Sequence, residues 1–421
     1  MKNKKVAVLI LAAGKGTRMK SETPKVLHEV CGRPMLGYVL DLVKGIRPEK
    51  TVAILGYKSQ EVRKGLPKNV KIAIQKNLVG SADAVKCGLS ALAGFKGTIL
   101  VLYGDMPLLP KESIQKLLKY HAENQPKATI LVATVDKPHG YGRIIRDQYA
   151  CIKSVVEEKD ANDFQKEIKE INTGIAFFDA LSLRQALAKV RPNNRKKEYY
   201  LTDVFSILYQ KLERVESVTI EDANLALGIN SRVDLAKANS IMQRRINDEY
   251  MKSGVTIVDP ATTFISYGVK IGPDTLIYPF TVIERNVKIG NCCQIGPFVH
   301  LRQDTAIASK VLLGNFIEVV RSQLSTGIFA KHFCYLGDSR VGRDVNIGAG
   351  TVTANFNGLT KGVTVIKDKA FTGANSVLVA PVTIGKNAKV GAGAVVLKNT
   401  KVSDNMAVAG VPAKPIKTKT R

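Results

Sequence analysis

Hydrophobic positions follow two different patterns along this chain, one in each half. In the first half, short aliphatic runs alternate with stretches whose apolar positions recur every three or four residues. The runs predict buried β-strands and the stretches predict amphipathic helices. The expected strands are residues 6–11, 51–55, 70–74, 98–102 and 129–135, and the expected helices are residues 34–44, 81–92 and 111–124. This alternation predicts an α/β domain with a mostly parallel, Rossmann-like sheet and a ligand at the carboxyl ends of its strands.

The second half repeats every six residues. Its aliphatic positions run in unbroken steps through Ile265, Ile271, Ile277, Ile283, Ile289, Ile295, Leu301, Ile307, Leu313 and Val319. After shorter steps the pattern resumes three times, up to Val408. Neither the helical period of 3.6 nor the strand period of 2 explains it. In a hexapeptide coil every sixth residue returns to an inward-facing position, so we expect a left-handed parallel β-helix.

Changes of pattern divide the chain into four segments. Residues 1–228 form the expected α/β domain, 229–252 a helical arm, 253–412 the β-helix and 413–421 a basic tail. Ser231 is a suitable N-cap for the arm, with Asp234 in its first turn. Residues 354–365 interrupt the hexads, which predicts a projecting loop of the kind that often carries function.

One loop in the first half carries candidate chemistry. The buried segment 6–11 leads into Leu11-Ala12-Ala13-Gly14-Lys15-Gly16-Thr17-Arg18-Met19, and Pro24-Lys25 follows. Glycines expose backbone N–H groups at the start of a helix, and Lys15, Arg18 and Lys25 add positive charge, so the segment suits a phosphate group. The spacing fits neither the Walker loop nor the dinucleotide fingerprint. The alternative is an ordinary turn with surface cations.

Composition narrows the class of protein. A hydrophobic content of 45% with 24% charged residues argues against disorder. No apolar stretch approaches the length that spans a bilayer, so no membrane insertion is expected. Lys2, Lys4 and Lys5 before residues 6–13 imitate a signal peptide, but cleavage there would remove the phosphate loop. Six scattered cysteines predict free thiols and not zinc ligands, and together these features predict a cytoplasmic protein.

The chain is strongly basic, with a formal net charge of +27. Such a charge suits anionic substrates, although a lysine-rich proteome would explain it equally well. No nucleic-acid-binding motif accompanies the charge, so no nucleic-acid partner is expected.

The phosphate loop, α/β half, arm and hexapeptide half, in this order, resemble one enzyme family along essentially the whole chain. It is the bacterial family of bifunctional N-acetylglucosamine-1-phosphate uridylyltransferases and glucosamine-1-phosphate N-acetyltransferases. The resemblance implies acetyl transfer from acetyl-CoA to glucosamine 1-phosphate in the second half. It implies uridylyl transfer from UTP to N-acetylglucosamine 1-phosphate, with release of pyrophosphate, in the first. It also implies a homotrimer with acetyl-transfer sites between subunits.

In the first half the resemblance assigns roles to residues of seven short motifs. Arg18 and Lys25 match catalytic positions that stabilise phosphate charge. The UDP-sugar positions are Leu11, Ala12, Ala13, Gly14, Lys25, Gln75, Gly80, Ser81, Tyr103, Gly104, Asp105, Gly142, Glu157, Asn172 and Asn230. Asp105 and Asn230 match the family's metal ligands, which implies Mg²⁺. A carboxylate and an amide oxygen suit this ion, which takes few protein ligands and several phosphate oxygens.

In the second half the resemblance is less complete. His332 matches the family's general base. A neutral imidazole suits this role, because it can take a proton from the attacking amine. The sugar-phosphate and amine positions are Arg302, Tyr335, Asn346, Asn355, Phe356 and Lys361, and the acetyl-CoA positions are Ala349, Ala374 and Ala392. The other four histidines have no such context.

Some positions depart from the family pattern. Val320 stands where the family has a lysine that binds the sugar phosphate, and Arg321 follows it. Since neighbours on a strand point to opposite faces, Arg321 is not expected to replace that lysine. Phe356 and Asn357 replace a tyrosine and an aspartate. Besides the bifunctional enzyme, the sequence therefore allows a uridylyltransferase whose β-helix is only a trimerisation scaffold, an enzyme with a different sugar or acyl acceptor, and a non-enzymatic assembly module.

Overall fold

The computed structural model describes residues 5–226 and 228–416. Contacts divide the chain into two compact units that meet in sequence between Asn239 and Ser240. Lys2, Lys4 and the end of the expected basic tail, residues 417–421, lie outside the described residues.

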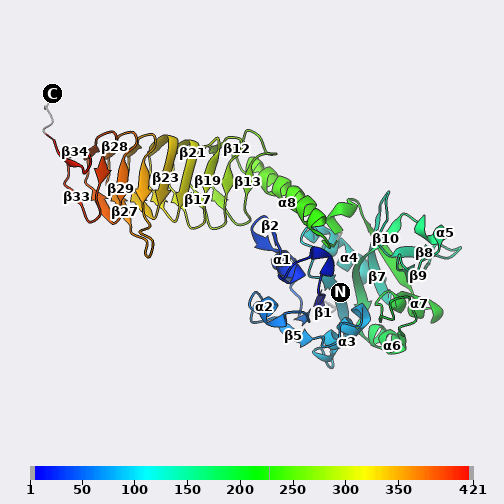
Figure 1. The fold of residues 1–421 in the computed structure, drawn as a ribbon. Coiled ribbons are helices and arrows are strands. Elements are labelled where there is room, and N and C mark those ends of the chain that lie inside the picture. The colour runs from blue at the N-terminus through cyan, green and yellow to red at the C-terminus, as the bar shows by residue number, and fades with distance from the viewer. Residues whose placement is uncertain (1–4, 227, 417–421) are drawn as a thin grey trace. The chain divides into compact units, whose positions relative to one another are not determined.

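The first unit is built on one twisted sheet (Figure 1). Its strands lie in the order β11–β7–β10–β6–β1–β4–β5, all parallel except β10, which is antiparallel to β6 and β7. The antiparallel hairpin β8–β9 extends from β10. The strands are β1 (Val6–Ala12), β4 (Lys50–Leu55), β5 (Lys71–Ile74), β6 (Thr98–Tyr103), β7 (Ala128–Thr134), β8 (Arg143–Arg146), β9 (Ile152–Val156), β10 (Glu170–Asp179) and β11 (Val215–Ile220), with β2 (Glu29–Val30) and β3 (Arg33–Pro34) forming a separate small hairpin.

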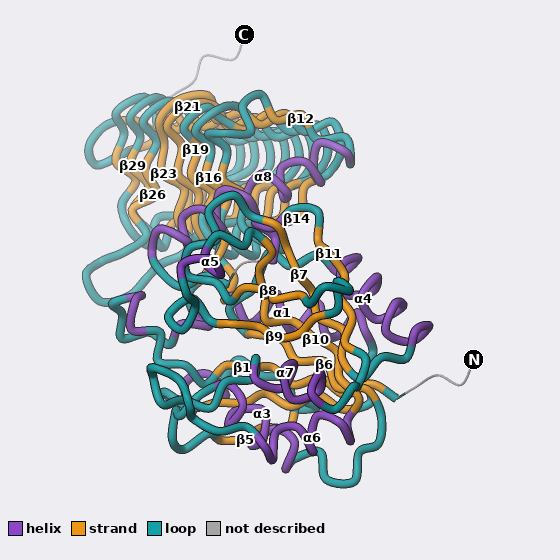
Figure 2. The backbone as a smooth tube through the Cα atoms, turned by 90° about the vertical axis from the view of Figure 1, so that its right-hand side faces the viewer, coloured by secondary structure: helices purple, strands orange, loops and turns teal. Residues whose placement is uncertain are grey.

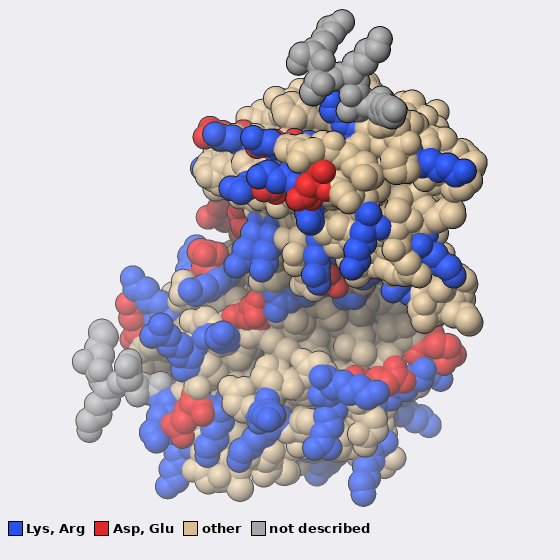
Figure 3. Space-filling model, turned by 90° about the vertical axis from the view of Figure 1, so that its left-hand side faces the viewer, with Lys and Arg blue, Asp and Glu red and all other residues tan. Residues whose placement is uncertain are grey.

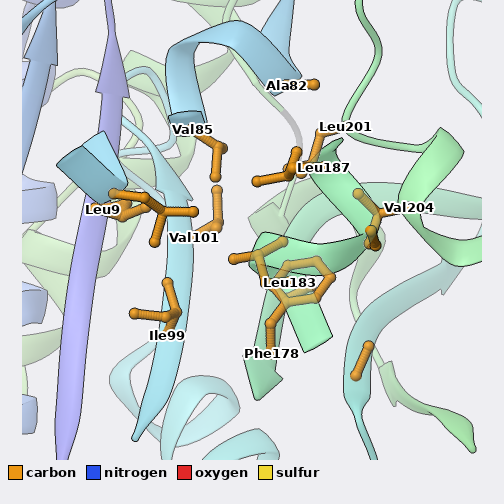
Figure 4. Packing of buried hydrophobic residues seen from close by; sticks show 14 of the residues in the cluster. Leu9, Ala82, Val85, Ile99, Val101, Phe178, Leu183, Leu187, Leu201 and Val204 are labelled. Carbon is orange, nitrogen blue, oxygen red and sulfur yellow. The ribbon is translucent and has the colours of Figure 1, made fainter. Parts of the chain in front are cut away.

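Helices cover both faces of this sheet because alternate residues of each buried strand point to opposite sides. Leu9 and Ile99 pack with residues of α3, α6 and α7, as Figure 4 shows, whereas Val8 and Leu100 pack with residues of α1, α2 and α4. The helices are α1 (Met35–Ile46), α2 (Ser59–Arg63), α3 (Ser81–Ser90), α4 (Lys111–Asn124), α5 (Asp163–Lys166), α6 (Ala180–Lys189) and α7 (Asp203–Gln210), with short 3-10 turns at Thr17–Met19, Lys25–Leu27 and Ala223–Ala226. The α/β fold expected from the sequence is confirmed.

All eight elements expected in the first half are present, with ends that shift by a few residues. The sequence pattern missed the elements between residues 143 and 220. Polar residues interrupt the apolar runs there, and β10 pairs antiparallel with strands far away in sequence. Local periodicity carries no information about such pairing.

Helix α8 (Arg232–Lys252) begins in the first unit and continues in the second. Asp234 Oδ2 accepts hydrogen bonds from the backbone N–H groups of Asn230 and Ser231 at 3.1 and 2.9 Å. Ser231 Oγ accepts the Asp234 N–H at 3.2 Å, so Ser231 caps the helix as its position predicts.

The second unit is a parallel β-helix, and Figure 2 shows its short strands stacked coil upon coil. Equivalent residues are 18 apart in the first coils, as in Leu276 opposite Gln294, and 17 apart for Leu312 opposite Phe329. The strands are β12 (Thr256–Ile257), β13 (Phe264–Ile265), β14 (Lys270–Ile271), β15 (Leu276–Ile277), β16 (Val282–Ile283), β17 (Lys288–Ile289), β18 (Gln294–Ile295), β19 (Val299–Leu301), β20 (Ala306–Ile307), β21 (Leu312–Val320), β22 (Gln323–Leu324), β23 (Phe329–Gly337), β24 (Ser339–Val341), β25 (Asn346–Ile347), β26 (Val352–Ala354), β27 (Thr364–Ile366), β28 (Phe371–Thr372), β29 (Val377–Val379), β30 (Val382–Ile384), β31 (Lys389–Val390), β32 (Val395–Val396), β33 (Lys401–Val402), β34 (Ala407–Ala409) and β35 (Lys414–Pro415).

The hexad positions fill the interior of this coil. From Ile277 to Val319 every one is buried, whereas Ile271 near the first coil is only half-buried. The step between Ser339 and its partner Thr364 is 25 residues, so the extra residues leave the coil between β26 and β27. They form the loop that the broken pattern predicts, closed by a bridge between Phe356 and Lys361.

The structure bears on three expectations about the protein, namely membrane insertion, the state of the cysteines and the distribution of charge. Among the described helices, none is both long and apolar enough to cross a membrane. All six cysteines are free thiols, and burial raises the pKa of Cys31 to about 11 and of Cys334 to about 12, which makes both thiols unreactive. Figure 3 shows Lys and Arg side chains spread widely over the visible face, with fewer Asp and Glu.

Candidate functional site

A cleft of about 250 Å³ opens at the carboxyl ends of β1 and β6. It is lined by ten residues that the sequence singled out, namely Leu11, Ala12, Ala13, Gly14, Lys25, Gln75, Gly80, Ser81, Tyr103 and Asp105. The Gly104 N–H donates to the Leu11 carbonyl at 2.9 Å, and the Gln75 N–H donates to the Leu55 carbonyl at 2.8 Å. These bonds hold the loops that follow neighbouring strands at one edge of the sheet, where ligands of such folds bind.

The phosphate loop folds back on itself at Gly16. This residue has φ 63°, and a side-chain carbon added there would lie 2.6 Å from Cβ of Lys25. Only glycine therefore lets Lys25 approach the loop. Arg18 lies on the 3-10 turn that follows and is exposed to solvent.

The ammonium of Lys25 brings the two expected metal ligands together. Its Nζ forms an ion pair with the Asp105 carboxylate and donates to Asn230 Oδ1 at 2.8 Å. The carboxylate is nearly buried. Two oxygens from loops 125 residues apart thus converge on one cationic position.

The other end of the cleft is framed by Gln75, Gly80 and Ser81. The Gln75 amide donates to the Gly80 carbonyl at 3.0 Å and to Asp83 at 2.9 Å. Gly80 has φ 125°, and a side chain there would collide with the Tyr199 carbonyl, which would lie 2.3 Å from the added carbon. Ser81 Oγ accepts the N–H of Leu201 at 2.9 Å. These hydrogen bonds hold the frame in place.

The three expected sugar-binding residues gather on the antiparallel side of the sheet. The Asn172 N–H donates to the Gly142 carbonyl at 2.8 Å, and Gly142 lies beside the Glu157 carboxyl. Thr202 Oγ1 donates to Glu157 Oε1 at 3.2 Å. Burial raises the pKa of Glu157 and, more strongly, that of Tyr103, whose ring packs next to Gly174.

Asp203 follows Thr202 at the start of α7, and burial together with the charge of Asp160 raises its pKa from 3.8 to about 6. The folded protein therefore binds a proton more readily than the unfolded chain, and the charged form destabilises it above about pH 6. We expect Asp203→Asn to raise the free energy of unfolding at pH 8 by about 1 kcal/mol, a value reduced by partial solvation of the carboxyl. The gain should shrink as the pH falls through 6 and disappear near pH 4.

Urea denaturation at pH 8, 6 and 4 checks this expectation. The control is Asp163→Asn, because the bond to Lys166 lowers the pKa of that exposed carboxyl and the sign of its effect is opposite. A gain for Asp203→Asn that does not depend on pH would contradict the assignment.

Several residues of this site were missed by sequence reasoning. Glu198 lines the cleft, Thr202 holds Glu157, and His28, which was given no role, accepts a hydrogen bond from Arg232. They lie in loops and turns without a motif of their own, so only their neighbours in space distinguish them.

A second site lies on the β-helix. His332 projects from β23 and is exposed. Ala349 follows His332 by 17 residues, Ala374 follows Ala349 by 25 and Ala392 follows Ala374 by 18, which are the steps of successive coils. Bonds from the Asn375 N–H to the Ala349 carbonyl and from the Gly393 N–H to the Ala374 carbonyl join these coils. The expected general base and the three expected acetyl-CoA positions therefore form one column.

His332 is oriented by its neighbour in the preceding coil. Its Nδ1 lies 3.4 Å from Oδ1 of Asn315, with which it is in register. Since an amide oxygen only accepts, this contact favours the tautomer with the proton on Nδ1. Nε2 is then the basic nitrogen.

The expected acceptor positions fall into separate groups on the β-helix. The Tyr335 hydroxyl and the Asn355 amide meet over Gly337, and Lys361 lies in the loop that follows. Arg302 pairs with Glu318 at 3.0 Å, beside Tyr335. Phe356 is exposed on the projecting loop. Asn346 lies on β25, in register with Phe329 of β23 and Phe371 of β28.

The expectation that Arg321 does not replace the family's lysine rested on the alternation of side chains along a strand. That alternation does not apply to Arg321. Val320 is the last residue of β21 and is 1% exposed, whereas Arg321 lies beyond the strand in a left-handed turn with φ 47°. Its guanidinium donates twice to Asp338, at 2.7 and 2.8 Å, and Asn355 donates to the same carboxylate. Arg321 thus shares Asp338 with Asn355, one of the expected acceptor positions, and its charge is compensated by that carboxylate.

Comparison with known proteins gives two family matches. Residues 8–170 match the MobA-like NTP transferase domain, and residues 268–316 and 364–398 match the bacterial transferase hexapeptide repeat.

Relatives named Bifunctional protein GlmU are similar over most of the chain. The chain is 41% identical to the one from Shouchella clausii over 421 residues, which cover 92% of this chain and 93% of that protein. It is 43% identical to the one from Geobacillus thermodenitrificans, covering 92% of each. It is 40% identical to the one from Alkaliphilus metalliredigens, covering 94% of this chain and 93% of that protein.

Proposed function

Because this chain belongs to the family of bifunctional GlmU proteins, we propose that it carries out two successive steps of UDP-N-acetylglucosamine synthesis, one in each unit. The second unit transfers an acetyl group from acetyl-CoA to glucosamine 1-phosphate. The first unit transfers a uridylyl group from UTP to the resulting N-acetylglucosamine 1-phosphate and releases pyrophosphate. The observation that carries the proposal is the convergence of Lys25, Asp105 and Asn230 at the edge of the cleft.

Uridylyl transfer is limited by repulsion between anions, since one phosphate attacks another. Positioned positive charge is therefore the main catalytic resource. Lys25 lies at the cleft edge and Arg18 on the neighbouring turn. The half-buried Glu157 and Asn172 suit the hydroxyl and amide groups of a sugar. Gln75 and the Gly80–Ser81 frame suit a planar base at the other end.

The donor set fits Mg²⁺. Asp105 and Asn230 offer one carboxylate and one amide oxygen, and both already contact a single ammonium, so the position favours a cation. Among the described residues, no group of three or more His, Cys, Asp or Glu side chains is placed to hold a metal ion by itself, and Mg²⁺ takes its other ligands from phosphate and water. When bound there, Mg²⁺ would neutralise phosphate charge.

Acetyl transfer requires a base for the amine that attacks the thioester. His332 Nε2 suits this role, because Asn315 occupies the other nitrogen and the imidazole is exposed. Tyr335, Asn355 and Lys361 lie on the acceptor side, and the alanine column leaves room for acetyl-CoA. We assign the phosphate of the acceptor to Arg302 with Arg321, since Val320 offers no charge.

We also propose a homotrimer. Phe280, Phe298 and Phe316 stack along one corner of the β-helix with ring centroids 4.9 and 5.0 Å apart, and each is about half exposed. Each also has φ between 55° and 58°, a costly conformation for a bulky residue. By contrast, the outward positions on the face of β14, β17, β20, β22 and β24 carry no aromatic side chain and are Lys270, Lys288, Ala306, Gln323 and Arg340. An exposed aromatic ladder marks an interface, and a closed threefold ring buries it.

Phe298→Glu places a charge in the middle of this ladder. We expect it to lower the mass measured by light scattering at micromolar concentration from that of a trimer to that of a monomer. The matched control is Gln323→Glu, which adds the same charge to the polar face and should leave the trimer intact. A parent protein that is monomeric under these conditions would refute the proposed assembly.

The two reactions are tested by two product assays on one preparation. Release of coenzyme A is measured with acetyl-CoA and glucosamine 1-phosphate, and release of pyrophosphate with UTP and N-acetylglucosamine 1-phosphate. Pyrophosphate without coenzyme A would support the second candidate, a uridylyltransferase whose β-helix is a scaffold or takes another acyl acceptor. The buried, uncharged Val320 is the observation that favours that candidate.

A further inference from the structure

Lys25 is anchored to the first unit by more than its ammonium. The backbone N–H of His28 donates to the Lys25 carbonyl at 3.2 Å and closes the 3-10 turn Lys25–Leu27. The His28 carbonyl in turn accepts the Met35 N–H at 3.0 Å, at the start of α1. His28 is therefore the point at which the segment that carries Lys25 is fixed to the body of the unit.

The side chain of His28 contacts the start of α8. Its Nδ1 lies 3.3 Å from Nη1 of Arg232, the first residue of α8, and Nε of the same guanidinium donates to the Met19 carbonyl at 3.2 Å. Arg232 follows the metal-ligand candidate Asn230 by two residues. One side chain thus joins the end of the phosphate loop, the Lys25 segment and the Asn230 segment.

The protonation of this pair is determined by its chemistry. A guanidinium can only donate, so Nδ1 of His28 must be the acceptor and the imidazole must be neutral, with its proton on Nε2. His28 is 7% exposed, and burial and the Arg232 charge both lower its pKa. A hydrogen bond to the Thr23 backbone raises the pKa and only partly offsets these two effects.

We propose that His28, held by Arg232, is a positioning residue for uridylyl transfer that fixes Lys25 against Asp105 and Asn230. This inference rests on the proposed function of the first unit. The contacts form a closed ring: Arg232 holds His28, His28 holds the backbone of Lys25, and the Lys25 ammonium holds Asn230, two residues before Arg232. Removal of one contact lets Lys25 move relative to both oxygens without removing any group that touches substrate.

Steady-state kinetics of pyrophosphate release with His28→Leu, His28→Asn and Arg232→Ala test the proposal. The Asn side-chain oxygen occupies nearly the place of Nδ1 and preserves the acceptor, whereas Leu removes it. We expect His28→Leu and Arg232→Ala each to lower kcat by about 10–100-fold, the range known for outer-shell partners, with KM for UTP changed less than threefold. His28→Asn should stay within threefold of the parent, and the double variant should be no worse than either single variant.

Arg244→Ala serves as the matched control, since the exposed Arg244 lies on the same helix and pairs with the half-buried Asp248. A loss in His28→Asn as large as in His28→Leu, an effect confined to KM, or additive losses in the double variant would overturn the proposal. Thermal unfolding of each variant shows whether the fold is retained.

Chemical labelling gives a readout that does not depend on activity. Lys25 Nζ is nearly buried and paired, so an amine-reactive reagent should modify it slowly in the parent protein. Mass spectrometry should show labelling several-fold faster in His28→Leu and Arg232→Ala but not in His28→Asn, with the exposed Lys20 as internal standard. Unchanged labelling overturns the inference. If the parent protein releases no pyrophosphate but the labelling pattern is as expected, only the proposed function is overturned.

Discussion

Replacement of Asp105 by Ala should reduce pyrophosphate release from UTP and N-acetylglucosamine 1-phosphate by about 10³-fold, because preorganised charge at the reacting phosphates is worth this much in comparable sites. The carboxylate is one of two oxygens at the cationic position and is the partner of Lys25. Its loss removes a ligand of the proposed metal and also leaves a nearly buried ammonium without its counter-ion. Two independent contributions to charge neutralisation are therefore weakened together.

Asp105→Asn keeps the shape of the side chain and one oxygen, so it separates the charge from the packing. We expect a smaller but still large loss, and added Mg²⁺ should recover more activity in Asp105→Asn than in Asp105→Ala. Coenzyme A release by the same variants serves as the internal control, since Asp105 lies in the first unit and should not affect it. Turnover by Asp105→Ala close to that of the parent would refute the assignment of this residue.

His332→Ala should lower the release of coenzyme A from acetyl-CoA and glucosamine 1-phosphate by about 10²–10⁴-fold, the usual contribution of a general base. Removal of the imidazole leaves no other basic side chain in the column that runs through Ala349, Ala374 and Ala392. The loss should be mainly in kcat, because the acceptor and acetyl-CoA positions are unchanged. Pyrophosphate release by the same variant should equal that of the parent.

Asn315→Ala refines this test, because Asn315 only orients the imidazole. We expect a loss of about tenfold, since an orienting contact contributes less than the base itself.

The two outcomes for the parent protein are equally informative. Release that depends on His332 shows that a buried Val320 is compatible with acetyl transfer to the sugar phosphate. No release, with uridylyl transfer intact, directs attention to another acyl acceptor.

The sequence determined those features that depend on local periodicity. The hexads predicted the β-helix, because every sixth residue must return to the interior and only small or aliphatic side chains fit there. The break after Ala354 predicted the projecting loop, because extra residues cannot enter a coil of fixed length. The alternation of aliphatic runs with amphipathic stretches predicted the α/β sheet. The loop after β1 predicted one wall of the cleft, because a phosphate loop has its own local sequence pattern.

Only the tertiary structure decided which of these residues meet. Lys25, Asp105 and Asn230 are far apart in sequence, and their convergence depends on the order of the strands, which local pattern does not encode. The same holds for His28, a histidine without a motif that gains a partner only when α8 begins beside it. Arg321 was expected to point to the face of the strand opposite that of Val320. The strand ends at Val320, however, and Arg321 lies in a left-handed turn that brings its guanidinium to Asp338. Periodicity fixes what is buried within an element, whereas long-range packing sets the distances between side chains on which the chemistry depends.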